Sequence, residues 1–434
     1  MVAYRRAGVA VLLVTTLAGC RGSQPPAASS STSAAPAASA PSSLEFAVPG
    51  HANGSPSVAA FGKRIAVVWT ATAESKSDVY LSVSTDNGLR FGAPVRVNDV
   101  QGEARASGEQ PARVAINKAN IHVVWPARLE GRPVIRYARS DDDGRTFSKA
   151  ETVAGDGRSG ARGWEAMTLG YDGSVQLVWL DGRNDVSAAH QHNRGPATAK
   201  PAMKATGRGP RQDIFHASWK GDSPRGERPV AADVCFCCKT AIATAGEHVY
   251  VAFRHLYPGG VRDIAVAESK DNGVTFEKPV RVSEDNWKID ACPDDGAAMV
   301  ADAHGRIYIT WPTLMATDTP RKGIFYAALG ETGTFSPRLR LDSGDTDPAH
   351  PQIGSDDHGN TAVVWDERAS GTRRIVLRRV ANGVAEAPET FAGEGVTYPV
   401  AAAAEDHWII VWSAQRGTDG SAIEGRRLPF KAHH

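Results

Sequence analysis

The sequence has no long run of basic residues and almost no excess charge of either sign. Its 49 lysines and arginines are balanced by 48 aspartates and glutamates, which leaves a formal net charge of +1. A nucleic-acid-binding protein needs a basic face or stripe to neutralise phosphates. The composition therefore predicts no nucleic-acid partner, and it gives no electrostatic reason for the folded part to lie on a membrane.

Long apolar segments and helical periodicity are missing as well. The apolar stretch near the N-terminus, residues 8–17, is too short to span a bilayer as a mature helix. No part of the chain shows a sustained 3.6-residue period. Instead, short apolar strands alternate with turns rich in Gly and Asp, a pattern that predicts an all-β protein.

The N-terminus carries the pattern of an export signal. Arg5 and Arg6 precede the apolar stretch, which ends in Leu17-Ala18-Gly19-Cys20. This ending resembles a bacterial lipobox, in which cleavage leaves Cys20 as a lipid-bearing N-terminus; an ordinary secretory signal cleaved nearby is the alternative. Several acyl chains on one residue anchor a protein stably. By resemblance to Gram-negative sorting, Arg21 after the cysteine points to the outer membrane, with the protein facing the periplasm or the surface.

Three regions follow from this reading. Residues 1–20 are the predicted signal peptide, and residues 21–43 consist of Ser, Ala and Pro with almost nothing apolar to bury. Such a segment cannot offset its ordering entropy, so it is expected to be a flexible tether. Residues 44–434 are expected to form a single domain, and we expect a monomer.

Seven apolar strands each end in an aromatic residue. A recurrent interval of this kind signals a repeat architecture. The interval between the third and fourth strands is longer, so an insertion is expected around residues 186–211. The seven aromatic residues are Trp69, Trp125, Trp179, Phe253, Trp311, Trp365 and Trp412.

A second marker, Ser-x-Asp-x-Gly-x-x-Phe, occurs in three of the repeats. The Asp carboxylate can accept hydrogen bonds from its own turn, and the Gly can adopt φ > 0. The Phe can bury between adjacent sheets, so we interpret the marker as a structural device. The three aspartates are Asp86, Asp142 and Asp271.

These markers are Asp boxes, and everything after residue 44 resembles the sialidase-like (BNR repeat) β-propellers. The resemblance implies an all-β propeller, with each repeat as a blade of four antiparallel strands. Seven blades are expected, with Leu44–Val48 supplying the outer strand of the last one. Six blades, as in classical sialidases, are the alternative. The cysteine pattern further resembles a bacterial branch of these propellers that is labelled exo-α-sialidase.

Apart from Cys20 the chain has four cysteines, and they open two adjacent repeats. Cys235, Cys237 and Cys238 stand in one repeat and Cys292 in the next, so one cluster at a mouth of the channel is expected. Two disulfides in an oxidising compartment are one interpretation. A soft-metal site for Cu(I) or Zn, with His350 as an extra ligand, is another. A redox role is the third.

The family resemblance also implies a candidate active site. Sialidases use three arginines for the substrate carboxylate, a Tyr nucleophile helped by a Glu, and an Asp acid/base. The Phe/Tyr-Arg-Ile-Pro motif that carries the first arginine is missing from the first repeat, which weighs against classical sialidase activity. By their offset from the repeated aromatics, the candidates are Glu165 with Tyr398 as nucleophile pair, Asp295 as acid, and Arg113, Arg162 or Arg254 as carboxylate ligands.

Three functions stay open at this stage. The first is a module that binds a glycan or a protein at the channel mouth. The second is copper, zinc or redox handling at the cysteines. The third is a glycoside hydrolase of exo-α-sialidase type with an altered active site.

Overall fold

A computed structural model describes most of the chain after the predicted tether. The described residues are 43–153, 160–185, 211–221, 224, 226–289, 295–315, 321–393, 395–417 and 420–430. Cys20, Cys292 and residues 186–210 of the predicted insertion lie outside them. Within the described part, no helix has the length and apolar character needed to cross a membrane.

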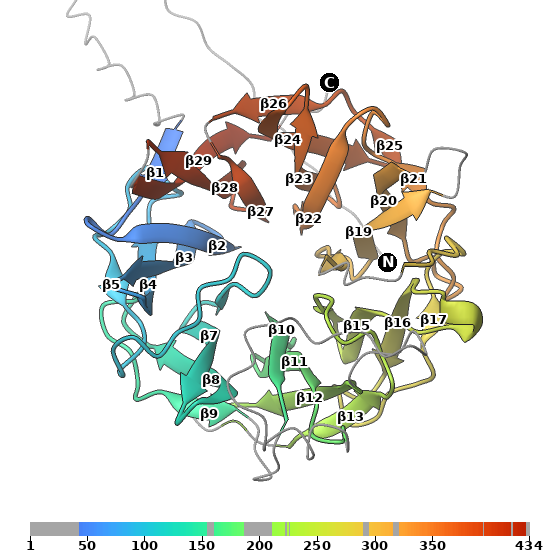
Figure 1. Ribbon diagram of the computed structural model, residues 1–434, viewed down its shortest axis with the longest axis horizontal. Helices are drawn as coiled ribbons and strands as arrows, with labels where there is room; N and C mark the ends of the chain where they lie inside the picture. The colour runs from blue at the N-terminus through green and yellow to red at the C-terminus, as the bar shows by residue number, and fades with distance from the viewer. Residues whose placement is uncertain are drawn as a thin grey trace, which may run out of the picture. The chain divides into compact units, whose positions relative to one another are not determined.

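The strands form seven antiparallel sheets arranged as blades around a central axis (Figure 1). The prediction of an all-β, seven-bladed propeller is confirmed, and the six-bladed alternative is wrong. Blade 6 departs from four strands, because β26 also pairs with β24.

From the axis outward, the first three blades consist of the following strands. They are β2 (Ala52–Phe61), β3 (Arg64–Ala73), β4 (Lys76–Ser84) and β5 (Val95–Arg96); β6 (Arg113–Ile116), β7 (Ile121–Leu129), β8 (Arg132–Ser140) and β9 (Glu151–Val153); and β10 (Arg162–Leu169), β11 (Val175–Asp181), β12 (Asp213–Trp219) and β13 (Arg228–Ala231).

The remaining blades are built in the same order. They are β14 (Ala241–Ala245), β15 (His248–Arg254), β16 (Ile264–Ser269) and β17 (Val280–Arg281); β18 (Ala298–Ala301), β19 (Ile307–Met315), β20 (Arg321–Ala328) and β21 (Leu339–Arg340); β22 (Asp347–Ser355), β23 (Thr361–Ala369), β24 (Thr372–Ala381), β25 (Val384–Ala385) and β26 (Glu389–Ala392); and β27 (Thr397–Ala403), β28 (His407–Arg416), β29 (Gly420–Pro429) and β1 (Ser43–Phe46).

The two ends of the domain close the ring together. The first strand, β1, pairs with the last, β29, and appears in Figure 1 as a blue strand beside a red one. Leu44 and Phe46 are buried in the core, whereas Ser43 and Glu45 are exposed. The Phe46 ring packs 4.8 Å from Phe91 of blade 1, measured between ring centroids. The predicted closure by this segment is confirmed.

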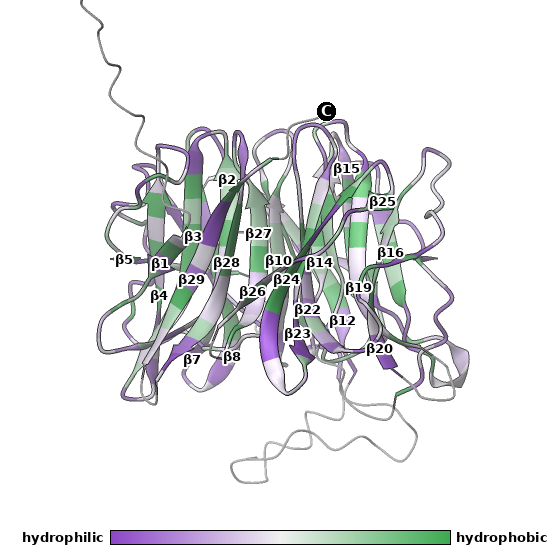
Figure 2. Ribbon diagram, turned by 90° about the horizontal axis from the view of Figure 1, so that it is seen from above, coloured by the Kyte–Doolittle hydropathy of each residue, from purple (hydrophilic) through white to green (hydrophobic). Residues whose placement is uncertain are grey.

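The hydrophobic core lies between the blades. Figure 2 shows the apolar segments, in green, along the strands. The seven repeated aromatic residues lie inside the second strand of each blade, which continues beyond them, and all are at most 2% exposed. Several of the buried indoles also donate a hydrogen bond: Nε1 of Trp69 to Asn53, of Trp179 to Asp181, of Trp311 to Asp285 and of Trp365 to Glu367. These hydrogen bonds satisfy the buried indole N–H groups and hold the four rings in place.

The three Asp boxes fold into the same turn. In the second box, Ser140 Oγ accepts a hydrogen bond from Gly144 N at 2.8 Å, and Asp142 Oδ1 accepts one from Thr146 N at 2.9 Å. The other two boxes repeat both bonds. Hydrogen bonds from Thr146 lower the pKa of Asp142 to about 2. The turn therefore keeps its shape with the carboxylate ionised.

Truncating Phe46 should destabilise the whole propeller, because the residue joins the two ends of the chain. We expect Phe46→Ala to lower the free energy of unfolding by about 3–5 kcal/mol, the usual cost of removing a buried Phe. Glu45→Ala is the matched control on the same strand; its partner Arg416 is exposed, so the loss should stay below about 1 kcal/mol. Urea denaturation of both variants measures the difference. An equal loss of unfolding free energy in the two variants would contradict the idea that burial of Phe46 holds the ring closed.

Candidate functional site

Four innermost strands share the same irregularity near their starts. The register of the strand pair shifts between Gly54 and Ser57, Gly163 and Ala166, Ala349 and Gln352, and Thr397 and Val400. Each shift is a β-bulge, which redirects the side chains around it. In each bulge a non-glycine residue has a left-handed backbone: Ser55 (φ 59°), Trp164 (60°), His350 (56°) and Tyr398 (54°). Such conformations cost about 1–3 kcal/mol and gather at functional sites.

The central channel is lined by the innermost strands of all seven blades. Its cavity of about 390 Å³ is bounded by residues of β2, β6, β10, β14, β18, β22 and β27. Since the bulges lie near the starts of these strands, they gather at one end of the channel, which we call the mouth.

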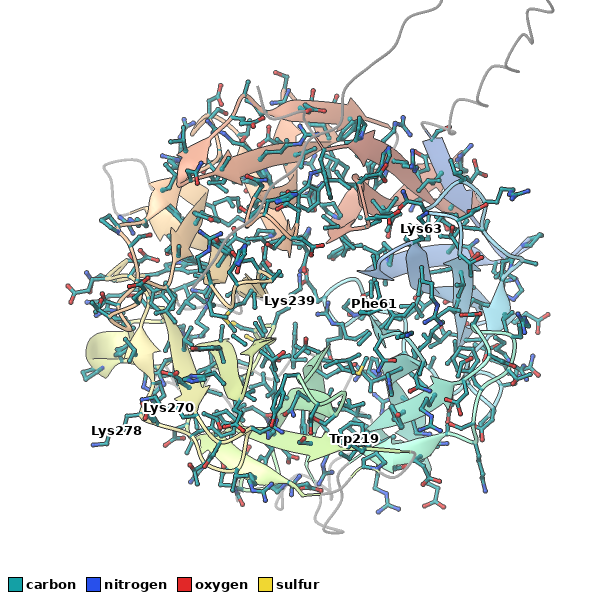
Figure 3. All side chains as sticks on the ribbon, turned by 180° about the vertical axis from the view of Figure 1, so that it is seen from behind. Phe61, Lys63, Trp219, Lys239, Lys270 and Lys278 are labelled. Carbon is teal, nitrogen blue, oxygen red and sulfur yellow. The ribbon has the colours of Figure 1, made fainter. Side chains whose placement is uncertain are left out.

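Glu109, in the loop before β6, is the centre of a side-chain network at the mouth. Its Oε1 accepts a hydrogen bond from Tyr398 Oη at 3.2 Å and lies 2.9 Å from His350 Nε2. Its Oε2 pairs with Lys239 Nζ at 2.9 Å. Figure 3 shows Lys239 beside the centre of the ring. A carboxylate thus connects one residue from each of three blades.

Two further carboxylates hold this arrangement in place. Asp295 accepts the backbone N–H of His350 at 2.7 Å and lies 3.5 Å from Lys239 Nζ. Asp366 contacts His350 Nδ1 at 2.6 Å and pairs with Arg373. The rings of His350 and Tyr398 pack with their centroids 4.1 Å apart. We call Glu109, Lys239, Asp295, His350, Asp366 and Tyr398 the mouth cluster.

The network fixes the protonation of its members. Burial alone would raise the pKa of Glu109, but the hydrogen bond from His350 and the charge of Lys239 outweigh it and lower this pKa to about 2. Burial, followed by the charge of Glu109, raises the pKa of Tyr398 above its ordinary value. At neutral pH the cluster therefore presents an ionised carboxylate and a protonated phenol, which donates a hydrogen bond.

The mouth cluster fills the space around it. The pocket bounded by Lys239, His350 and Tyr398 holds only about 10 Å³. A larger hollow of about 580 Å³ lies elsewhere, at the Asp boxes of blades 1 and 2. The two carboxylates that line it are engaged, Asp86 within its own turn and with Arg90, and Asp143 with Arg64. A ligand of the cluster would rest on its outer surface.

Tyr398 and Asp295, both predicted from their offset, lie together in the cluster, but Tyr398 has a different partner from the predicted one. Its hydroxyl bonds to Glu109, whereas Glu165 is buried and its carboxylate oxygens have no hydrogen-bond partner among the described residues. Burial raises the pKa of Glu165 to about 7. The catalytic roles of Glu165, Tyr398 and Asp295 stay predictions. Glu109 and Lys239 were missed, although Lys239 directly follows Cys238, which the sequence analysis places at a mouth of the channel.

The three predicted carboxylate-binding arginines have separate surroundings. Arg113 lines the channel, and its Nε donates to the backbone oxygen of Glu165 at 3.2 Å. Arg162 is engaged by Asp181, with Nε 3.0 Å from Oδ2. Arg254 stacks over the Trp287 ring at 4.3 Å and donates to backbone carbonyls. Among the three, Arg113 is the one that faces the channel, and the predicted substrate role is untested for all of them.

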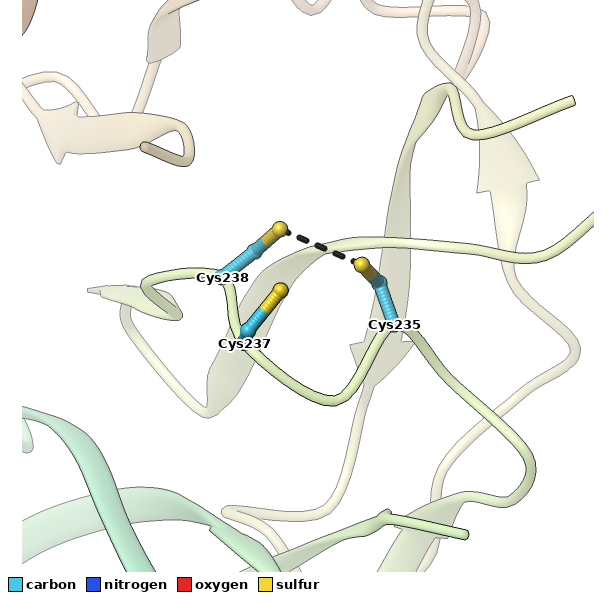
Figure 4. A group of neighbouring side chains, drawn as sticks. All are labelled: Cys235, Cys237 and Cys238. Carbon is cyan, nitrogen blue, oxygen red and sulfur yellow. Dashed lines mark hydrogen bonds between the residues drawn. The ribbon is translucent and has the colours of Figure 1, made fainter. Parts of the chain in front are cut away.

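Three of the predicted cysteines converge in the turn before β14 (Figure 4). The sulfur atoms of Cys235, Cys237 and Cys238 all lie within 4.8 Å of one another, and all three residues are buried. Cys235 and Cys238 are free thiols with their sulfurs 3.3 Å apart. Cys237 is disulfide-bonded, to a partner outside the described residues. We call these three residues the cysteine centre.

The surroundings of the cysteine centre shift the pKa values of its two free thiols in opposite directions. The hydrogen bond from Cys238, together with the charge of Arg262, lowers the pKa of Cys235 to about 6, whereas burial raises that of Cys238. His350, predicted as an extra metal ligand, has both ring nitrogens against carboxylates of the mouth cluster. Among the described residues, the group suited to a metal therefore consists of the three cysteines.

Comparison with known proteins identifies the fold. No protein-family model and no characterised protein sequence matches the chain. Among solved structures, a PL25 ulvan lyase is 10% identical with a TM-score of 0.53, covering 89% of this chain and 95% of its own. The polysaccharide lyase Uly1 is 9% identical with a TM-score of 0.53, over 89% and 91%. A Hadza microbial sialidase is 15% identical with a TM-score of 0.44; the alignment covers 72% of this chain and 63% of the sialidase. At these identities the likeness is one of fold.

The raised pKa of Glu165 predicts a pH-dependent stability. A carboxyl group with a folded pKa of about 7 stabilises the fold below its unfolded value, near 4.3, and this contribution is lost as the pH rises through 7. We expect Glu165→Gln to be more stable than the parent by about 3 kcal/mol at pH 8, with the difference vanishing near pH 4. Denaturant titrations at both pH values measure it. The exposed Glu151→Gln is the control, and an equal pH response of Glu165→Gln and the parent would contradict a protonated Glu165.

Proposed function

We propose that this protein is a saccharide-binding propeller whose recognition surface is the mouth cluster. The observation that carries the proposal is the pair of strained residues, His350 and Tyr398, whose rings pack at a tilt of 34° and which both contact Glu109. The propeller does not need these bulges, because the innermost strands of other blades pair without them. Backbone strain that the fold does not require occurs here in two neighbouring blades at the mouth. Such strain favours a functional role for the residues that carry it.

The chemistry of the cluster suits a polyhydroxylated ligand. Carboxylate oxygens and the phenol oxygen of Tyr398, whose own proton goes to Glu109, accept hydrogen bonds from hydroxyl groups, and the ammonium of Lys239 donates them. Trp164, at the third bulge of the same mouth, adds a half-buried aromatic surface. Convergent polar groups beside aromatic rings are typical of small-molecule sites. One of the ulvan lyases with a similar fold was solved with a bound GlcA-Rha3S oligosaccharide. Its ligand belongs to the same chemical class, a saccharide, as the ligand that we propose for this protein.

The protonation states of Glu109 and Tyr398 favour saccharide binding over hydrolysis with Tyr398 as nucleophile. Such a mechanism needs a base that removes the phenol proton. Glu109 is the carboxylate in contact with Tyr398, and with its pKa lowered to about 2 it is a weak base. The environment thus keeps the proton on Tyr398. Hydrolysis of exo-α-sialidase type is the alternative that the experiment below has to exclude.

Attachment to a membrane is part of the proposal and rests on the sequence. A lipid on Cys20 and the Ser/Ala/Pro tether of residues 21–43 would hold the propeller at the bacterial outer membrane, on the periplasmic or outer side. A module on such a tether would sample glycans or proteins close to the membrane surface.

Removing one hydrogen-bonding group from the cluster should weaken saccharide binding. After a glycan array identifies ligands, Tyr398→Phe should raise the Kd about 5–10-fold, as expected for one lost hydrogen bond of about 1–1.5 kcal/mol. Glu109→Gln should raise it further, because it also removes the charge paired with Lys239. Tyr171→Phe is the matched control, because it also loses a phenol bonded to a glutamate, Glu247, but follows the opposite end of β10. Isothermal titration calorimetry measures all three.

Two results would contradict this function. If Tyr398→Phe and Glu109→Gln bind as tightly as the parent, recognition does not occur at the mouth cluster. If the parent cleaves a fluorogenic sialoside, or releases unsaturated products from a polyuronate, and Tyr398→Phe does not, then the cluster is catalytic and a binding module is the wrong description.

A further inference from the structure

We propose that the cysteine centre is a soft-metal site, for Cu(I) or Zn(II), that becomes competent only when the disulfide at Cys237 is reduced. Its ligands are different side chains from those of the mouth cluster, and the proposal rests on their own geometry. In the state described here, two of the three sulfurs are thiols and the third is bonded to another sulfur.

The spacing of the sulfur atoms is close to that of a thiolate site. A metal with bonds of about 2.3 Å to tetrahedral or trigonal sulfurs separates those sulfurs by about 3.8–4.0 Å. In the centre all three lie within 4.8 Å of one another, with Cys235 and Cys238 at 3.3 Å. An adjustment of about half an ångström between these two sulfurs would therefore admit a metal with such bonds.

The surroundings fit a soft, charged site. Phe236, Leu256 and Trp164 pack against the three sulfurs and exclude water, as thiolate sites for Cu(I) require. Three thiolates around Cu(I) carry a net charge of −2, and around Zn(II) −1. Arg262 Nη1 lies 3.5 Å from Cys235 Sγ, close enough to offset part of this charge.

The disulfide at Cys237 controls whether the third ligand exists. A sulfur in a disulfide has no thiolate to offer, so the oxidised protein has two ligands at this place. Attack by a dithiol reductant breaks the S–S bond; two electrons and two protons pass to Cys237 and its partner, and the reductant becomes a disulfide. Metal binding then displaces the protons of the three thiols.

Thiol counting and metal titration on one protein test the proposal. The full-length chain with Cys20→Ser should show two thiols in denaturant without reductant, and four after dithiothreitol, because one disulfide is opened. After removal of reductant under anaerobic conditions, Cu(I) presented by a colorimetric chelator should bind at about one equivalent. The untreated protein should bind less than about a tenth of that amount.

Single substitutions identify the ligands. Cys235→Ser, Cys237→Ser and Cys238→Ser should each weaken Cu(I) binding by the reduced protein at least about tenfold. His350→Ala should leave it unchanged, because both ring nitrogens of His350 contact carboxylates of the mouth cluster. Thermal unfolding of each variant shows whether it is folded.

The comparison of oxidised and reduced parent protein needs no variant and decides the matter on its own. Equal binding before and after reduction, no binding of Cu(I) or Zn²⁺ in either state, or four thiols without reductant would each overturn the proposal. Loss of binding with His350→Ala, with the cysteine variants unaffected, would move the metal to the mouth cluster and also overturn it.

Discussion

A blade of four strands has two apolar faces and can bury both only between two neighbours. The structure depends on this constraint, because a row of blades would leave an exposed face at each end. Closure by β1 and β29 removes the last exposed faces, with Leu44 and Phe46 entering the core shared by blades 7 and 1. The closed ring then directs the starts of its innermost strands toward one mouth. Residues far apart in sequence, such as Glu109 and Tyr398, meet there as a consequence of closure.

Periodicity predicts the part of the structure that is repeated. The strands, the blade number and the closing segment could be derived because each blade buries the same kind of aromatic residue in the same place. The offset from these aromatics also brings His350, Tyr398 and Asp295 to one mouth. The side-chain pairing could not be derived, because a bulge shifts the direction of its residues and only some blades have one. In blade 3 this shift leaves Glu165 in the interior, and the loop residue Glu109 becomes the partner of Tyr398.

The mouth cluster shows how a group of buried charges can be kept in one arrangement. Three carboxylates face Lys239 and Arg373, so each of them has a cationic partner. Buried pairs of this kind add little net stability, since desolvation offsets their attraction, but breaking one of them is costly. The cluster is therefore rigid for an electrostatic reason. A rigid set of donors and acceptors loses little entropy when a ligand binds, which is what a recognition surface requires.

The cysteine centre and the mouth cluster are neighbours in the chain and in space. Cys238 directly precedes Lys239, and Trp164 packs against the sulfurs while its backbone oxygen accepts a hydrogen bond from Thr240 at 2.6 Å. A change in the sulfur positions, whether from a metal or from a disulfide, thus reaches both Lys239 and Trp164 without crossing the core. Lys239 pairs with Glu109, the centre of the cluster. Because coupling between two sites is reciprocal, a saccharide that holds Lys239 in place would also favour the one sulfur arrangement compatible with that position. The buried Lys239 is therefore the residue through which the proposed metal site and the proposed saccharide surface would act on each other.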